Sequence, residues 1–313
     1  MNNSFCRTSN LILSIDKATH LKPSDAKPSG EKLQKILAGV GIGSRREMER
    51  WITAGRVSIN GKKATIGDRA CSRDTISVDG RPVKLDTYNS NIRRVIAYNK
   101  PEGEICSRSD KAGRPCIFDK LPRLKGERWI AIGRLDLNTS GLLLLTTDGE
   151  LANRLMHPSN TIEREYAVRV MGNILPQNIK KLYDGVELDD GPARFTDIVS
   201  SGGTGINRWF HVCLAEGRNR EVRRLWESQG LTVSRLKRVR FGSTIIPDGL
   251  RVGRWQELER KQIDLLSAQV DLEPAKSYEK KKTELVGKQV PRVKQQRKQP
   301  AHSRVHSDRR RIK

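Results

Sequence analysis

The first stretch of regularly spaced apolar residues predicts two helices. Leu33, Ile36 and Leu37 recur at the spacing of one helix face, and three alternating glycines then end that helix. A second helix begins at once, because Ser44 and Glu47 form the S-x-x-E pattern of a capping box. In such a box the two side chains bond backbone N–H groups that the first helical turn leaves free.

Two strands follow these helices, and each ends in a tight turn. Residues 57–61 end in Asn-Gly and residues 76–80 end in Asp-Gly. These dipeptides favour two-residue hairpins because both turn positions need a positive φ. The local patterns agree with one another and predict a compact module of two helices and a small curved sheet over residues 30–90.

A larger domain is predicted over residues 91–270. Short runs of apolar residues begin near positions 95, 130, 142, 164, 195, 209 and 235, and only a few short helical patterns separate them. This order favours an α+β fold centred on a largely antiparallel sheet. The polar loop 133–141 lies between two of the apolar runs, a position at which folds commonly display reactive groups.

The charge of the chain indicates which kind of partner it binds. The 313 residues include 60 Lys or Arg against 36 Asp or Glu, a net charge of +24 with a pI near 10.2, which favours a nucleic acid as the partner. No apolar run approaches the roughly 18 residues that span a membrane, and no secretory leader pattern is present. Five scattered cysteines without a C-x-x-C pair favour a reducing cytoplasm and no metal site.

Both ends of the chain differ in composition from the two modules. Residues 1–29 are polar with little periodicity, and the predicted tail 271–313 is strongly basic, with 14 Lys or Arg against 3 Asp or Glu from Lys276 onward. We expect both tails to be disordered, and the basic one to contact RNA phosphates. The alternative for the basic tail is a solvated segment that only aids solubility.

Cations are concentrated in the first module, with few acidic residues between them. They are interpreted as RNA contacts, against the alternative of an ordinary solvated helix face. The predicted contacts are Lys32, Lys35, Arg45, Arg46, Arg50, Arg56, Lys62 and Lys63.

Local chemistry alone leaves the role of Asp136 open, because an aspartate in a polar loop is often a turn cap. The longer segment GRLDLNTSGLLLLTTDGELANRLMHP, however, resembles the catalytic signature of the RsuA and RluB branch of the pseudouridine synthases. Upstream Tyr-Asn-Lys-Pro at 98–101 and downstream Glu-Arg-Glu-Tyr at 163–166 match the same family in order and spacing, as does EGRNREVRR from 216. Residues 31–68 are similar to the S4 RNA-binding domain, so the resemblance covers about residues 31–265.

The resemblance implies the catalytic roles. Asp136 is expected to be the essential carboxylate, either as a nucleophile or by helping to form a glycal, and the sequence does not choose between these routes. Arg223 is expected to oppose protonation of that aspartate, and Tyr166 to stack on the loosened uracil and remove the C5 proton. Without the resemblance, both would be interpreted as ordinary structural residues.

Substrate contacts are predicted from the same resemblance. Arg134 is expected to fill the space left by a flipped nucleotide. Arg224 is the alternative to its neighbour Arg223 as the arginine that faces Asp136. Leu236 is expected either to pack beneath the base or to be an ordinary core residue. Many relatives carry His-Gln where this chain has Arg220-Glu221, which obscures the transfer of finer contacts. The predicted substrate-binding residues are Lys100, Arg134, Arg218, Arg224 and Leu236.

The sequence therefore predicts an enzyme that converts one uridine of large-subunit (23S) ribosomal RNA into pseudouridine. The alternatives are the small-subunit (16S) enzyme type and a non-catalytic RNA-binding factor in ribosome assembly. The reaction is an isomerisation, so no cofactor and no metal are expected. We further expect a cytoplasmic monomer.

Overall fold

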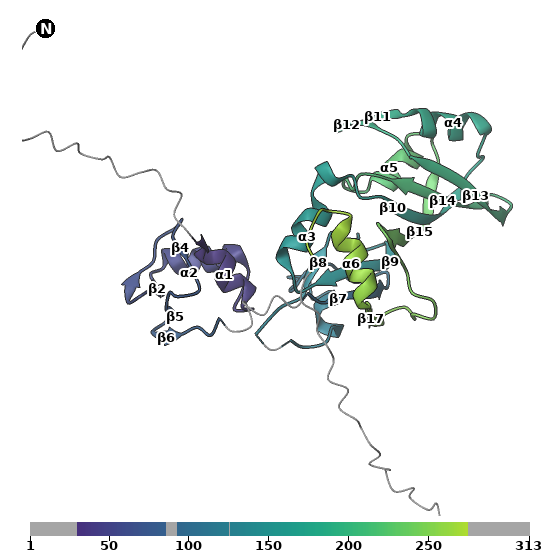
Figure 1. Cartoon of the computed structure of the whole chain (residues 1–313). Helices are drawn as coiled ribbons and strands as arrows, with labels where there is room; N and C mark the ends of the chain where they lie inside the picture. Colours follow the sequence, from purple (N-terminus) through teal and green to yellow (C-terminus); the bar gives the residue numbers. More distant parts are fainter. Residues whose placement is uncertain (1–29, 86–92, 125, 275–313) are drawn as a thin grey trace, which may run out of the picture. The chain divides into compact units, whose positions relative to one another are not determined.

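The structure is a computed structural model of the whole chain, and it describes residues 30–85, 93–124 and 126–274 (Figure 1). The two predicted tails lie outside these residues, apart from the four positions 271–274, and so does the predicted boundary between the modules at 90/91. The disorder of the tails and the domain boundaries therefore stay predictions.

The first module contains two helices, a four-stranded sheet and a strand pair. Its helices are α1 (Leu33–Gly39) and α2 (Arg45–Thr53). The sheet has the order β3-β2-β5-β6, and β1 pairs with β4. The strands are β1 (Glu31–Lys32), β2 (Val57–Ile59), β3 (Lys62–Lys63), β4 (Arg69–Ala70), β5 (Ile76–Val78) and β6 (Arg81–Pro82).

The local sequence signals of this module are confirmed. The capping box at α2 is present, since the Ser44 hydroxyl accepts from the Glu47 N–H and the Glu47 carboxylate accepts from the Ser44 N–H. Asn60-Gly61 joins β2 to β3 with φ of 50° and 80°, the left-handed pair of values that a two-residue hairpin needs. Asp79-Gly80 does the same between β5 and β6. Buried apolar residues from both helices and the strands form one core.

The second module is built on one large mixed sheet. Among residues 93–124 and 126–274 it comprises nine strands, with the main order β13-β14-β10-β15-β9-β7-β17, while β8 pairs with β9 and β16 with β15. All of these pairings are antiparallel except β9 with β15. The strands are β7 (Val95–Lys100), β8 (Ile130–Ile132), β9 (Ser140–Thr146), β10 (Arg164–Met171), β13 (Asp197–Thr204), β14 (Asn207–Leu214), β15 (Thr232–Phe241), β16 (Thr244–Ile245) and β17 (Trp255–Glu257).

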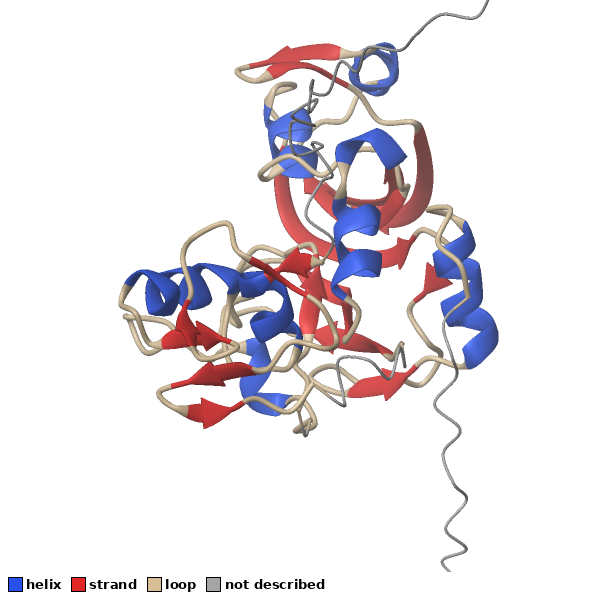
Figure 2. Cartoon of the chain, turned by 60° about the vertical axis from the view of Figure 1, so that its left-hand side comes forward, coloured by secondary structure: helices blue, strands red, loops and turns tan. Residues whose placement is uncertain are grey.

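Helices cover both faces of this sheet, which explains the continuous apolar runs in the sequence (Figure 2). Along β9, Leu142 and Leu144 pack with α3 and α6, whereas Leu143 and Leu145 belong to the core on the other face with α5. A strand buried on both faces needs apolar residues at every position. The helices are α3 (Gly149–Met156), α4 (Pro176–Asp184), α5 (Glu221–Glu227) and α6 (Arg260–Ala268), and a separate hairpin pairs β11 (Val186–Leu188) with β12 (Gly191–Ala193). The expected α+β class is confirmed.

The two halves of the sheet meet at β9. One edge of β9 pairs with β15 only at Ser140 and Gly141, and with β8 at residues 144–146. The loop 133–139 connects β8 to β9 and therefore emerges where the two halves join. The fold thus displays the predicted reactive loop at the centre of the sheet and not at its edge.

Two further findings concern membranes and metals. In the described parts of the chain, no helix is both long and apolar enough to cross a bilayer. Those same residues contain no group of three or more His, Cys, Asp or Glu side chains arranged to hold a metal ion.

Candidate active site

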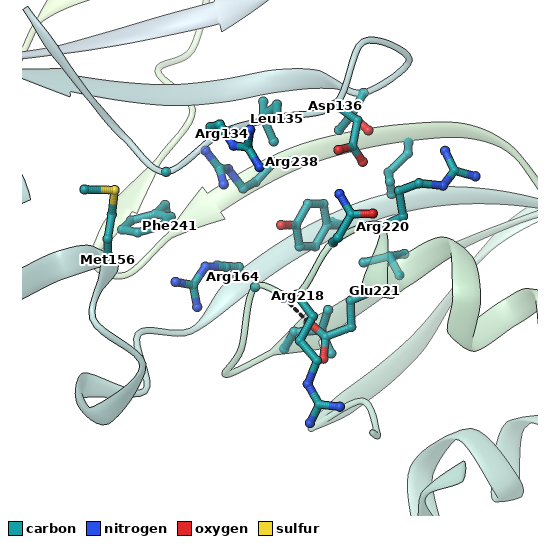
Figure 3. A pocket seen from close by; sticks show the side chains of 18 of the residues that line it. Arg134, Leu135, Asp136, Met156, Arg164, Arg218, Arg220, Glu221, Arg238 and Phe241 are labelled. Atoms are coloured by element: carbon teal, nitrogen blue, oxygen red, sulfur yellow. Dashed lines mark hydrogen bonds between the residues drawn. The ribbon is translucent and has the colours of Figure 1, made fainter. Parts of the chain in front are cut away.

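A cavity of about 450 Å³ opens beside the loop 133–139, within the size range of small-molecule sites (Figure 3). Its walls come from the loop, from β10 and β15, and from the segment that leads into α5. Four of the predicted site residues with side chains of different chemistry line it together, namely Arg134, Asp136, Tyr166 and Leu236. Residues far apart in the sequence therefore meet in one place.

Asp136 is held by its backbone and leaves its side chain available. Its carbonyl accepts from the Thr139 N–H at 3.1 Å, which closes a turn in the loop. The carboxylate points into the cavity (Figure 3). Among the described residues, no side chain or N–H group donates a hydrogen bond to that carboxylate, so a substrate can approach it.

Lys100, from the end of β7, supports this loop. Its side chain is fully buried, and its ammonium group donates to the carbonyls of Pro101, Asp136 and Thr139 at 3.0 to 3.1 Å. Burial lowers the pKa of this lysine, while nearby acidic groups, Asp136 among them, oppose that effect. All three N–H groups of Lys100 are used inside the protein, so the structure shows it supporting the loop, and a direct substrate contact stays a prediction.

Arg223, from α5, also supports this loop. It is 8% exposed on α5, and its guanidinium donates to the carbonyls of Asn138 and Val233 at 2.8 Å each. Burial lowers its pKa, and the Asp136 charge is among the groups that oppose the shift. Arg223 therefore contacts the loop through a backbone carbonyl, and its expected effect on the Asp136 carboxylate stays a prediction.

Tyr166 and Leu236 form the apolar wall opposite the loop. Tyr166 lies on β10 and is 9% exposed, and Leu236 lies on β15 and is 4% exposed. The register pairs Val168 with Leu236 and Tyr166 with Arg238, so these side chains share the cavity face of the sheet. A flat ring beside a buried leucine provides a surface on which a base can stack.

The remaining predicted arginines differ in placement. Arg134 is exposed and lines the cavity. The Arg218 side chain also lines it, but its guanidinium is bonded to Glu216, to Asp190 and to the carbonyls of Gly191 and Pro192.

Arg224 is paired inside the protein, and its contact with substrate stays a prediction. Its guanidinium forms a two-bond ion pair with Asp190 at 2.8 and 2.9 Å, and the residue does not line the cavity. This places it away from the loop, which leaves Arg223 as the arginine that contacts the loop.

Several cavity residues were not predicted from the sequence. Arg164, Arg238 and Phe241 line one end of the cavity, and Glu221 lines another part. Alternation along a strand was an available signal, since Arg164 lies two residues before Tyr166 and Arg238 two residues after Leu236.

Glu221 is an unusual carboxyl group for a protein surface cavity. It is 3% exposed, and one oxygen accepts from the Arg218 N–H at 3.0 Å. Burial raises its pKa, and the hydrogen bond from Arg218 partly opposes this shift. Glu221, where many relatives were expected to carry glutamine, therefore lines the cavity. Its bond to the Arg218 N–H also holds the segment before α5.

The predicted RNA-binding cations of the first module fall into two groups. Lys35 is paired with Glu31, and Arg56 is paired with Asp79 and stacks 4.0 Å from the centre of the Trp51 ring. The other six are exposed, as expected of phosphate contacts: Lys32, Arg45, Arg46, Arg50, Lys62 and Lys63.

Comparisons with known proteins agree with this arrangement. A family model described as RNA pseudouridylate synthase matches residues 94–228, and the S4 domain model matches residues 31–76. The chain is also similar to a solved structure titled "Crystal structure of pseudouridylate synthase", with a TM-score of 0.53 and 24% identity over 75% of this chain and 99% of that one. That likeness concerns the fold alone.

Curated relatives are much closer in sequence. The ribosomal large subunit pseudouridine synthase B of Pseudomonas aeruginosa is 58% identical over 248 residues, which are 79% of this chain and 64% of that protein. The protein of the same name from Salmonella typhimurium is 53% identical over 280 residues, which are 88% of this chain and 96% of the relative.

Proposed function

Because this chain belongs to the RNA pseudouridylate synthase family, we propose that it converts one uridine of large-subunit ribosomal RNA into pseudouridine, with Asp136 as the reacting carboxylate. The observation that carries this proposal is the Asp136 carboxylate, which points without a partner into a cavity that Tyr166 and Leu236 line. The names of the close relatives favour the large-subunit RNA as the substrate.

The proposed reaction requires a carboxylate, a group that accepts a proton and a fixed geometry, and residues of this site can supply all three. The bond between ribose C1′ and uracil N1 breaks, the base rotates, a C5–C1′ bond forms, and the proton on C5 is transferred so that the product is an isomer. Asp136 either bonds covalently to the substrate or assists formation of a glycal. Tyr166 stacks on the loosened uracil and accepts the C5 proton, and Lys100 and Arg223 keep the loop in position.

The first module supplies the grip on the RNA in this proposal. Its exposed cations release counterions from phosphates, so they provide affinity that depends on salt but carries no sequence information. Specificity for one uridine then depends on the cavity, into which the target nucleotide is flipped. We further propose that the protein acts as a monomer in the cytoplasm, where its ribosomal RNA substrate is made.

The test is pseudouridine mapping of both ribosomal RNAs from cells that lack this protein. The cells are complemented with the native chain or with Asp136→Asn, which keeps the size of the side chain but removes its charge. We expect one large-subunit site to disappear and only the native chain to restore it. Loss of a small-subunit site would identify the other enzyme type, and an unchanged pattern in both RNAs would leave the assembly-factor hypothesis.

A further inference from the structure

A half-buried arginine and a buried one share one aromatic ring at the end of the cavity. The guanidinium carbons of Arg164 and Arg238 each lie 5.1 Å from the centre of the Phe241 ring. Arg134, from the loop, lies at the same end, so three positive charges gather there (Figure 3). Asp136 occupies a separate part of the cavity wall.

These charges have no anionic partner inside the described parts of the protein. Arg238 is 2% exposed, and its Nε donates to the carbonyl of Leu142, whereas its buried Nη2 has no hydrogen-bond partner there. Arg164 donates from Nη1 to the carbonyls of residues 162, 215 and 216. Among the residues that the structure describes, no ion pair reaches Arg134, Arg164 or Arg238.

Such a grouping of like charges is unfavourable by itself. A guanidinium keeps its charge in proteins, and two like charges taken out of water repel each other strongly. Burial lowers the pKa of Arg164, and the charge of Arg238 lowers it further. The face of the Phe241 ring offsets only part of this cost. An anion bound between the guanidiniums would satisfy the unpartnered Nη2 and remove the repulsion.

We propose that Arg164, Arg238 and Arg134 form a phosphate subsite for the flipped nucleotide, and that they bind a phosphodiester attached to the ribose that reacts at Asp136. This inference rests on the proposed function. A nucleotide whose C1′ lies at Asp136 carries its phosphates on the same ribose, and the cavity volume is in the range that holds one small ligand. Guanidiniums bind phosphate through paired N–H groups, which fixes orientation as well as distance.

The proposed subsite explains how ribose C1′ is positioned at the Asp136 carboxylate. Phosphate contacts determine register and orientation without reading sequence. A phosphate fixed at the Phe241 end would hold C1′ at the carboxylate, and small displacements of a reacting atom are costly. The three arginines are therefore positioning residues of the reaction, beyond the exposed cations of the first module.

The test combines a protein change with a matching RNA change. The substrate is an RNA hairpin that contains the uridine identified by the mapping described above. It is synthesised with a neutral methylphosphonate at the linkage either 5′ or 3′ of that uridine, and kcat/KM is measured with the native protein and with Arg238→Gln. We expect Arg238→Gln and one of the two methylphosphonates each to lower kcat/KM by about 10- to 100-fold. Combined, they lower it no further than either change alone.

Two additional variants make the outcome decisive. Arg235→Gln, an exposed position on the same strand, should leave the effect of each methylphosphonate unchanged. Because Arg238 is buried, the exposed Arg134→Gln is measured in parallel and should show the same non-additivity on a smaller scale. If both methylphosphonates lower kcat/KM by the same factor in the native protein and in both variants, the subsite proposal is wrong. If the native protein does not convert the unmodified hairpin, the proposed function fails first.

Discussion

The cations behind the catalytic loop and those on the first module are the same residue types in opposite settings. Lys100 and Arg223 are 0% and 8% exposed, and their N–H groups end on backbone carbonyls of the loop 133–139 or its neighbours. Six cations of the first module are exposed to water. The buried pair fixes a geometry, whereas the exposed set attracts a polyanion from a distance.

The physical reason for this difference is the surrounding medium. Inside the protein a charged donor forms strong, directed bonds, and removing it leaves buried carbonyls without partners. In water the same charge is screened over about 10 Å, so its effect depends on salt and only weakly on its exact position. Changes at the two regions should therefore affect different measured quantities.

The largest effect is expected for Lys100→Met. This change keeps the length of the side chain but leaves the carbonyls of Pro101, Asp136 and Thr139 without their donor. We expect a loss of about 2–4 kcal/mol in the free energy of unfolding and a fall of roughly 100-fold or more in kcat. Urea unfolding and single-turnover kinetics measure the two quantities. Lys111→Met, at an exposed position, is the control, and a native kcat in Lys100→Met would contradict the supporting role.

The second effect concerns Arg223→Lys. Lysine keeps the charge but cannot span the carbonyls of Asn138 and Val233 with one planar group. We expect kcat to fall about 10- to 100-fold with little change in KM, because the loop is displaced while the RNA contacts remain. The neighbouring Arg224→Lys should change kcat less than about twofold, since that arginine pairs with exposed Asp190. Equal losses of kcat in Arg223→Lys and Arg224→Lys would contradict a specific role of Arg223 in supporting the loop.

The third effect is confined to RNA binding. In the double variant Arg46→Ala and Arg50→Ala, the slope of log affinity against log salt should decrease by about two, roughly one for each phosphate that an arginine no longer neutralises. At saturating RNA, kcat should equal that of the native protein. Lys35→Ala is a matched control, because Lys35 is already paired with Glu31. A changed kcat at saturation would mean that the module also takes part in positioning the substrate.

The smallest effect is the pH dependence contributed by Asp190. The guanidinium of Arg224 lowers the pKa of this exposed carboxyl to about 2. A carboxyl whose pKa is lower in the folded state stabilises the protein above its ordinary pKa of about 4, and this contribution is lost as the pH falls towards 2. The difference in Tm between the native chain and Asp190→Asn should therefore be constant near neutral pH and narrow below about pH 4. A difference that grows on acidification would contradict this assignment.

Features that depend on neighbours in the sequence were predictable. The capping box at Ser44 and the two glycine hairpins require only residues within three or four positions of one another, so tertiary packing did not change them. The apolar run that begins at Leu142 also predicted a strand, and its burial on both faces explains why the run contains no polar position before Thr146. The S4-like module and the loop of Asp136 belong to this predictable part.

The rest of the cavity depends on strand register, which local patterns do not determine. A register shift between Glu165 and Tyr166 pairs Tyr166 with Arg238, whereas an unshifted ladder would place Val239 there. That one-residue shift places Phe241 opposite Arg164, so Phe241 faces the cavity although it lies three residues after Arg238, which simple alternation along β15 does not predict. The loop-supporting bonds of Lys100 were not predictable for a related reason, since the sequence does not show that a lysine at the end of β7 bonds the carbonyls of a loop more than thirty residues later.

The support of one loop from two distant segments has a consequence for folding. Lys100 comes from β7 and Arg223 from α5, more than a hundred positions later, and both end on the carbonyls of the loop between β8 and β9. A growing chain on the ribosome therefore contains Asp136 well before it contains the arginine that completes the support of its loop. Catalytic competence would thus appear only after both halves of the sheet have assembled, so activity reports the completeness of folding, and a truncated product bearing the RNA-binding module would bind RNA without modifying it.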